Sequence, residues 1–152
     1  MIVHVRQAAT SDLEQIVSFN IDLAKETEGR QLDRATLTAG VNSVLTDVAK
    51  GTYLVATDDE NTVIGQLMIT TEWSDWRNGM LWWLQSVYVQ TSARRQGVFT
   101  ALVNEVARLA ALNPEVCGIR LYIEKDNQAA RSTYEAAGFK APGYDVMERL
   151  VS

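Results

Sequence analysis

The sequence has 152 residues, of which 47% are hydrophobic and only two are proline. This length and apolar content suit one compact domain, so we expect a single domain over residues 1–152. The formal net charge of −5 argues against nucleic acid as a partner, because proteins that bind nucleic acids present clustered Lys and Arg. The same charge mildly favours a cationic small molecule.

The cysteine and histidine content excludes several kinds of site. The chain has one cysteine, Cys117, and one histidine, His4. A lone cysteine cannot form an internal disulfide, and these two residues provide no cluster with metal-ligand spacing. We therefore expect neither a metal site nor a Cys–His nucleophile. No stretch approaches the roughly 20 apolar residues of a membrane helix, and the N-terminus lacks the layout of a signal peptide, which favours a cytoplasmic protein without a membrane partner.

The first 50 residues predict a short strand followed by two helices. Residues 2–6 alternate as a strand would, and Ser11 with Glu14 three residues later has the form of a capping box that begins a helix. Asp33 is a candidate N-cap for a second helix, because apolar residues recur behind it at helical spacing as far as Val48.

Strands follow in the middle of the chain. The β-branched runs at 52–57 and 62–71 flank a polar turn and predict a hairpin. A tryptophan-rich segment at 72–83 then leads into a third strand at 84–89.

The remaining segments alternate between helix and strand. We expect, in order, a loop at 91–97, a helix at 98–112, a strand at 118–124, a helix at 127–137 and two short strands at 139–142 and 144–150. The full order is βααβββαβαββ. It predicts an α/β fold with a mixed central sheet and helices on both faces.

The junction between the strand at 84–89 and the helix at 98–112 has the composition of an anion-binding turn. Free backbone N–H groups at the start of a helix and the positive end of its dipole bind phosphate, and Gly97 allows the backbone to approach closely. Arg94 and Arg95 add positive charge. Taken alone, the segment is equally well explained as a basic surface loop.

Residues 94–99, Arg-Arg-Gln-Gly-Val-Phe, resemble the pyrophosphate-binding signature [QR]-x-x-G-x-[GA] of the GNAT acetyltransferase superfamily. Phe99 stands where glycine or alanine is usual. The resemblance implies that backbone N–H groups from Gln96 to Thr100 hold the diphosphate of acetyl-CoA, and that Val87 to Val89 pair with its pantetheine arm as a false strand. The residues so assigned to the cofactor are Val87, Tyr88, Val89, Arg94, Arg95, Gln96, Gly97, Val98, Phe99 and Thr100.

A second motif lies downstream, where Asn127, Ala130, Arg131, Tyr134 and Gly138 share one helical face. Out of context, Tyr134 would be a core residue with its hydroxyl at the rim. The pattern N-x-x-A-x-x-x-Y-x-x-x-G-F is similar to the matching helix of GNAT enzymes. That similarity implies that Asn127, Ala130 and Arg131 contact the cofactor and that Tyr134 protonates the departing thiolate.

The tryptophan-rich segment at 72–83 is the candidate acceptor-binding region. It combines carboxylates with aromatic faces, which suit an ammonium ion. Alternatively, several of its tryptophans belong to the core or to a homodimer interface. The substrate-binding candidates are Glu28, Glu72, Asp75, Trp76 and Gln85.

This layout, together with segment 23–33, resembles the spermidine/spermine and thialysine acetyltransferase branch of the superfamily. That branch commonly carries Leu-Glu-Asp where this chain has Leu84-Gln85-Ser86. Gln85 thus replaces a carboxylate that helps deprotonate the amine, and Glu28, Glu72 or Asp75 would substitute for it through water.

The resemblance implies a single N-acetyltransferase domain that transfers an acetyl group from acetyl-CoA to a primary amine of a small molecule by direct attack. Two alternatives stay open. One is acetylation of a protein Lys or N-terminus. The other is a non-catalytic acetyl-CoA-binding sensor, because a fold does not guarantee its usual function.

Overall fold

The computed structural model describes residues 1–151. They form five strands and four α-helices: β1 (His4–Gln7), α1 (Leu13–Glu28), α2 (Arg34–Thr46), β2 (Thr52–Thr57), β3 (Val63–Ser74), β4 (Gly79–Val89), α3 (Val98–Ala111), β5 (Val116–Leu121) and α4 (Gln128–Ala136). The chain divides into two compact units, Met1–Tyr122 and Ile123–Ser152. The first unit holds the sheet and α1 to α3, and the second holds α4. None of the helices in the described range has both the length and the apolar character that a membrane span requires.

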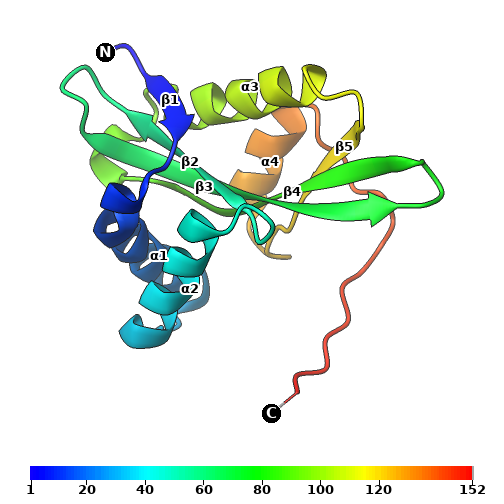
Figure 1. Ribbon diagram of the computed structural model, residues 1–152, viewed down its shortest axis with the longest axis horizontal. Coiled ribbons are helices and arrows are strands. Elements are labelled where there is room, and N and C mark those ends of the chain that lie inside the picture. The colour runs from blue at the N-terminus through cyan, green and yellow to red at the C-terminus, as the bar shows by residue number, and fades with distance from the viewer. Residues whose placement is uncertain (152) are drawn as a thin grey trace. The chain divides into compact units, whose positions relative to one another are not determined.

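The sheet of the first unit has the strand order β1-β2-β3-β4-β5. Neighbouring strands are antiparallel except for β4 and β5, which are parallel because α3 connects them as a crossover. Helices α1 and α2 cover one face of the sheet and α3 covers the other (Figure 1). The predicted mixed sheet with helices on both faces is confirmed.

The core on the α1 and α2 face follows from the helical spacing of apolar residues in α1 and α2 and from the two-residue alternation of side chains in β2. Ile16 and Val17 of α1 and Val41 of α2 pack against Tyr53 and Val55, which alternate along β2. On the opposite face, Gly65 of β3 lies under α3. A Cβ atom at Gly65 would lie 2.9 Å from Val98 Cγ1, so glycine is needed for the close approach of this helix.

Two sequence predictions need correction. The strands expected at 139–142 and 144–150 do not form in the described residues, where the chain after α4 has no regular secondary structure. Pro142 has no N–H to donate to a ladder, and Gly143 has a φ of 90°, which interrupts an extended run. The segment at 72–83 is not a separate element before the third strand. It forms the end of β3, a turn and the start of β4, and this hairpin extends beyond β2 (Figure 1).

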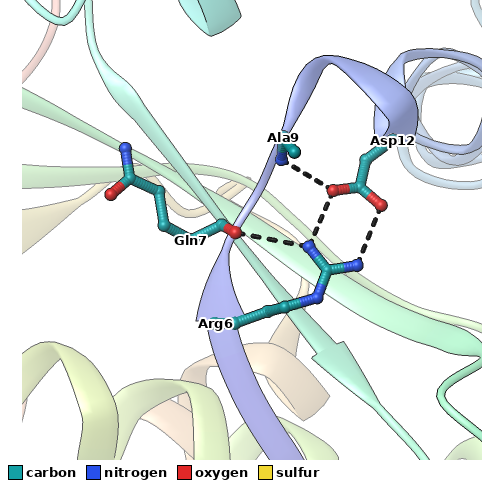
Figure 2. Close-up of polar contacts among 4 residues, drawn as sticks. All are labelled: Arg6, Gln7, Ala9 and Asp12. Carbon is teal, nitrogen blue, oxygen red and sulfur yellow. Dashed lines mark hydrogen bonds and ion pairs between the residues drawn. The ribbon is translucent and has the colours of Figure 1, made fainter.

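The start of α1 differs from the predicted capping box of Ser11 and Glu14. A 3-10 turn at Thr10–Asp12 precedes the helix, and Asp12 Oδ2 accepts the backbone N–H of Ala9 at 2.7 Å. Arg6 of β1 donates to both carboxylate oxygens of Asp12, at 2.8 and 3.0 Å (Figure 2). This bidentate pair joins β1 to the entry of α1.

We expect Asp12→Asn to lower the free energy of unfolding at pH 7 by about 1–3 kcal/mol, since it removes charge-assisted bonds from a group that is only 7% exposed. The hydrogen bonds from Arg6 hold the pKa of Asp12 below its usual 3.8. The stabilisation is therefore present above pH 3.8 and is lost as the pH falls through the lower folded-state pKa. Urea unfolding at pH 7 and pH 3 measures this, and the gap between wild type and variant should narrow at pH 3.

Asp33→Asn is a matched control, because asparagine is also a good N-cap for α2 and can accept the Thr36 N–H as Asp33 Oδ2 does at 3.0 Å. It should destabilise the protein much less than Asp12→Asn. Equal losses from the two variants would contradict a special role for the Arg6–Asp12 pair.

Candidate active site

Strand β4 separates from β5 partway along its length. The last registered pair of the parallel ladder is Leu84 with Leu121. Beyond it, β4 continues to Val89, and in residues 1–151 this last part is registered only with β3, with Val89 opposite Gly65. The edge of β4 from Gln85 to Val89 therefore presents backbone groups that an extended ligand can pair with.

A β-bulge lies where this open edge begins. Gln85 pairs with Met68 and Tyr88 pairs with Gln66, so two residues of β4 lie opposite one residue of β3. One of the two, Ser86, has a φ of 52°. The bulge changes the direction of the strand within the first residues of the open edge.

The turn after β4 ends in a cradle of backbone groups. Arg95 has a φ of 65°, and Gly97 has a φ of 83° as the N-cap of α3. A Cβ atom at Gly97 would meet nothing within 4 Å, so the space beside it is open. The first backbone N–H groups of a helix lack partners within it, and the positive end of the helix dipole lies at the same place, so the start of α3 can bind a diphosphate.

Sequence reasoning missed a carboxylate next to this turn. Glu26 of α1 accepts the Tyr88 hydroxyl at 3.3 Å through Oε1 and pairs with Arg94 Nη2 at 2.8 Å through Oε2. Arg94 also donates its Nε–H to the carbonyl of Val89 at 2.9 Å, and its guanidinium lies 5.3 Å from the centre of the Tyr88 ring. The available signal was helical spacing, because Glu26 is seven residues after Phe19, which packs against the same ring.

The environment of Tyr88 keeps its hydroxyl neutral. Burial raises the pKa of Tyr88, and the charges of Glu26 and Asp22 raise it further. The protonated Tyr88 hydroxyl thus donates a hydrogen bond to Glu26 at neutral pH.

Two of the predicted acceptor residues lie on the α1 side of the β3–β4 hairpin. Glu72 accepts the indole N–H of Trp83 at 2.9 Å, and Gln85 donates to Thr70 Oγ1 at 2.7 Å. Thr70 pairs with Trp83 and is two residues from Glu72, so these side chains share one face. The Trp83 ring stacks on Tyr122 with centroids 4.6 Å apart, which occupies one of its faces.

The structure does not bring the other acceptor candidates next to Gln85. Asp75 and Trp76 lie in the turn at the end of the hairpin, about 17 Å beyond Thr70 at roughly 3.4 Å per strand residue. Trp76 is 88% exposed. Glu28 is the last residue of α1 and, two positions after Glu26, points to a different side of the helix.

The second unit places the downstream motif on α4. Asn127 is its N-cap and accepts the Ala130 N–H at 3.0 Å, while Arg131 N–H donates to the Asn127 carbonyl. At the other end, Gly138 has a φ of 95°, which lets Phe139 N–H return to the Tyr134 carbonyl.

The Tyr134 ring packs edge-on against Phe139 with centroids 6.0 Å apart. Burial raises the pKa of Tyr134, so its hydroxyl keeps its proton at neutral pH. A neutral phenol that holds its proton has the property required of a general acid. Among residues 1–151, no three His, Cys, Asp or Glu side chains form a group that could hold a metal ion.

Comparison with known proteins gives consistent matches. The acetyltransferase (GNAT) family matches residues 16–139. A possible acetyltransferase from Clostridium difficile 630 is 43% identical, with a TM-score of 0.92 over 100% of this chain and 99% of that one. A predicted acetyltransferase with acetyl-CoA from Clostridium acetobutylicum is 19% identical, with a TM-score of 0.78 over 97% of this chain and 96% of that one, and is similar in fold. No curated protein matches the sequence.

The family match spans most of the chain, and the fold agrees with it. The open edge of β4 and the cradle at Gly97 are suited to a cofactor whose extended arm is joined to a diphosphate. The chain belongs to the acetyltransferase (GNAT) family and is an N-acetyltransferase that uses acetyl-CoA.

Proposed function

We propose that this enzyme acetylates a primary amine of a small molecule by direct attack of the amine on the thioester. The observation that carries the proposal is the continuity of the open β4 edge with the Gly97 cradle, flanked on the α1 side by the carboxylate of Glu26. We further propose that residues 1–152 act as one N-acetyltransferase domain, because the family match extends over parts of both units. The proposed location of the enzyme is the cytoplasm. Exposed Trp73 and Trp76 support a homodimer.

On the cofactor side, Val87 to Val89 would pair with the pantetheine arm, and the N–H groups of Gln96 to Thr100 would hold the diphosphate. Arg95 would add positive charge there, and Arg94, whose charge Glu26 partly balances, would add less. Asn127, Ala130 and Arg131, at the start of α4, would contact the cofactor arm, as the family motif implies. The positive φ of Gly97 and the open space at its Cβ position support this assignment, since a ligand can approach the backbone closely there.

The chemistry requires proton movement at two atoms. An alkyl amine with a pKa near 10.4 is neutral at only about one part in a thousand near pH 7, so a carboxylate must remove a proton directly or through water. Acetyl-CoA supplies the activated acetyl group. A backbone N–H of β4 would polarise the thioester carbonyl, and Tyr134 would donate its proton to the departing sulfur. No side chain needs to carry the acetyl group.

The acceptor is proposed to lie on the α1 side of β4. Glu26, Glu72 and Gln85 all belong to this side. Glu72 supplies negative charge for an ammonium group, whereas the charge of Glu26 is balanced by its ion pair with Arg94, so Glu26 contributes as a hydrogen-bond acceptor. A polyamine or a thialysine-type amine is therefore the first class to test. Gln85, where that branch carries glutamate, cannot remove a proton itself, so Glu26 or Glu72 would act instead.

Thiol release from acetyl-CoA tests the proposed function. The protein is incubated with acetyl-CoA and, separately, with diamines, polyamines, amino acids, and peptides that carry a free N-terminus or an internal Lys. We expect the highest kcat/KM with a small amine. Peptides as the better acceptors would support protein acetylation, and no turnover with any amine would support a sensor.

We expect Glu26→Gln and Glu72→Gln each to lower kcat/KM for the best amine by about 10- to 100-fold, which corresponds to the loss of one charge-assisted bond. Smaller losses are expected for Glu28→Gln and Asp75→Asn, because neither side chain lies beside Gln85. The Kd of CoA, measured by calorimetry, should change little in each variant. If all four variants keep the wild-type kcat/KM, the acceptor pocket lies elsewhere.

A further inference from the structure

The bulge in β4 needs support from its surroundings. Ser86 has a φ of 52°, a conformation that residues with a side chain rarely adopt without compensation. Serine rather than glycine stands there, so neighbouring groups must hold the backbone in place.

Gln66 of β3 is the nearest such group. Its side chain is completely buried, and its Nε2 donates to the Ser86 carbonyl at 3.0 Å. Its Oε1 has no hydrogen-bond partner among the described residues. Reversing the amide would place this oxygen against the Ser86 carbonyl, so only the observed orientation is favourable. A buried amide with one unsatisfied oxygen lowers the stability of the fold, and the hydrogen bond to Ser86 is the favourable interaction that this side chain makes.

A second support comes from the α1 side. The Tyr53 hydroxyl lies close to the Ser86 side chain and accepts Nδ2 of Asn20 at 3.2 Å. The same Nδ2 donates to the Ile16 carbonyl at 3.0 Å. Buried polar residues from β2, β3 and α1 therefore converge on one residue of β4.

We infer that Gln66 is a positioning residue for acetyl-CoA, which acts by locking the Ser86 bulge. The bulge lies between Leu84, the last residue paired with β5, and residues 87–89 of the open edge. Side chains alternate between the two faces of a strand. If β4 lost the bulge and paired regularly with β3, every side chain after it would lie on the opposite face of the sheet. Tyr88 would then turn away from Glu26, and the edge groups would change direction. The inference rests on the proposed pairing of residues 87–89 with pantetheine.

The test is Gln66→Met, which keeps the length of the side chain and removes its donor. We expect the Kd of CoA, measured by calorimetry, to rise on the order of tenfold, because the edge groups proposed to pair with pantetheine would be displaced, and the loss of about one hydrogen bond corresponds to roughly tenfold in affinity. Backbone amide NMR signals of the CoA-free protein should shift at residues 85–89. Tyr53→Phe, a milder change that removes only a hydroxyl, should alter both measurements in the same direction and by less.

Val41→Ala is the control for general destabilisation. Val41 is 3% exposed in the core between α2 and the sheet, so this variant should lose stability without a change in CoA affinity. A rescue variant adds Ser86→Gly to Gln66→Met. Glycine reaches positive φ without a side-chain penalty, so the double variant should bind CoA more tightly than Gln66→Met alone.

The inference is overturned if Gln66→Met, folded by circular dichroism, binds CoA as tightly as Val41→Ala does. It is also overturned if Ser86→Gly gives no recovery, since the bond would then not act through the backbone of residue 86. CoA affinity does not depend on the acceptor. A wild-type protein that binds CoA but acetylates no small amine would thus refute the proposed function and leave this inference standing.

Discussion

Replacing Gly97 with glutamate is expected to abolish acetyl-CoA binding while the protein remains folded. Gly97 has a φ of 83° and open space where a Cβ atom would be, so the new side chain would project into the space proposed for the diphosphate. Placing like charges together costs several kcal/mol, and each 1.4 kcal/mol is tenfold in affinity, so the Kd of CoA should rise about 100-fold or more. Calorimetry with CoA measures this, and circular dichroism checks the fold.

Two control variants separate charge from backbone strain. Gly97→Gln has the same size and the same unfavourable φ without the charge, so it should bind more tightly than Gly97→Glu. Gly143→Glu places the same residue at another positive-φ glycine, at 90°, with open space around it. It should leave CoA affinity near the wild-type value. An unchanged Kd in folded Gly97→Glu would remove the diphosphate from this turn.

The parts of the fold with strong local signals were predictable from sequence. The β-branched run at 52–57 identified β2, and Asp33 was correctly expected to cap α2, where its Oδ2 accepts the Thr36 N–H. Helix α3 and its N-terminal Gly97 were also placed correctly, because a strand, a glycine turn and an amphipathic helix follow one another in the sequence. Each of these features depends on residues that are close together in the chain.

Features that depend on distant residues could not be predicted. The positive φ of Ser86 has no local signal, since its supports Gln66 and Tyr53 come from other strands. Helical spacing places Glu26 on the same side of α1 as Phe19, but its contacts with Tyr88 and Arg94, which lie 62 and 68 positions away in the chain, have no local signal. The error at the C-terminal end came from reading short apolar runs as strands. A strand forms only when a neighbouring strand pairs with it, and the local sequence does not specify that partner.

Tyr134→Phe is expected to lower kcat by roughly 100- to 10,000-fold, the usual contribution of a general acid. Burial raises the pKa of Tyr134, so the wild-type hydroxyl holds its proton across the neutral range, and its ionisation should cause no loss of rate between pH 7 and 9. Phenylalanine keeps the ring and its edge-on contact with Phe139. The Kd of CoA and the stability should therefore change little, which distinguishes a lost proton donor from a damaged site.

Steady-state turnover should be combined with single-turnover measurements, so that the chemical step is observed directly. Tyr144→Phe, which removes a hydroxyl from a 67% exposed tyrosine in the same unit, should turn over like the wild type. A loss below 100-fold in Tyr134→Phe would mean that water protonates part of the thiolate, which leaves fairly well because its pKa is near 8.5. The effect should then grow with pH, as protonation by solvent becomes slower. If Tyr134→Phe matches the wild-type rate with chemistry shown to be rate-limiting, the hydroxyl has no catalytic role.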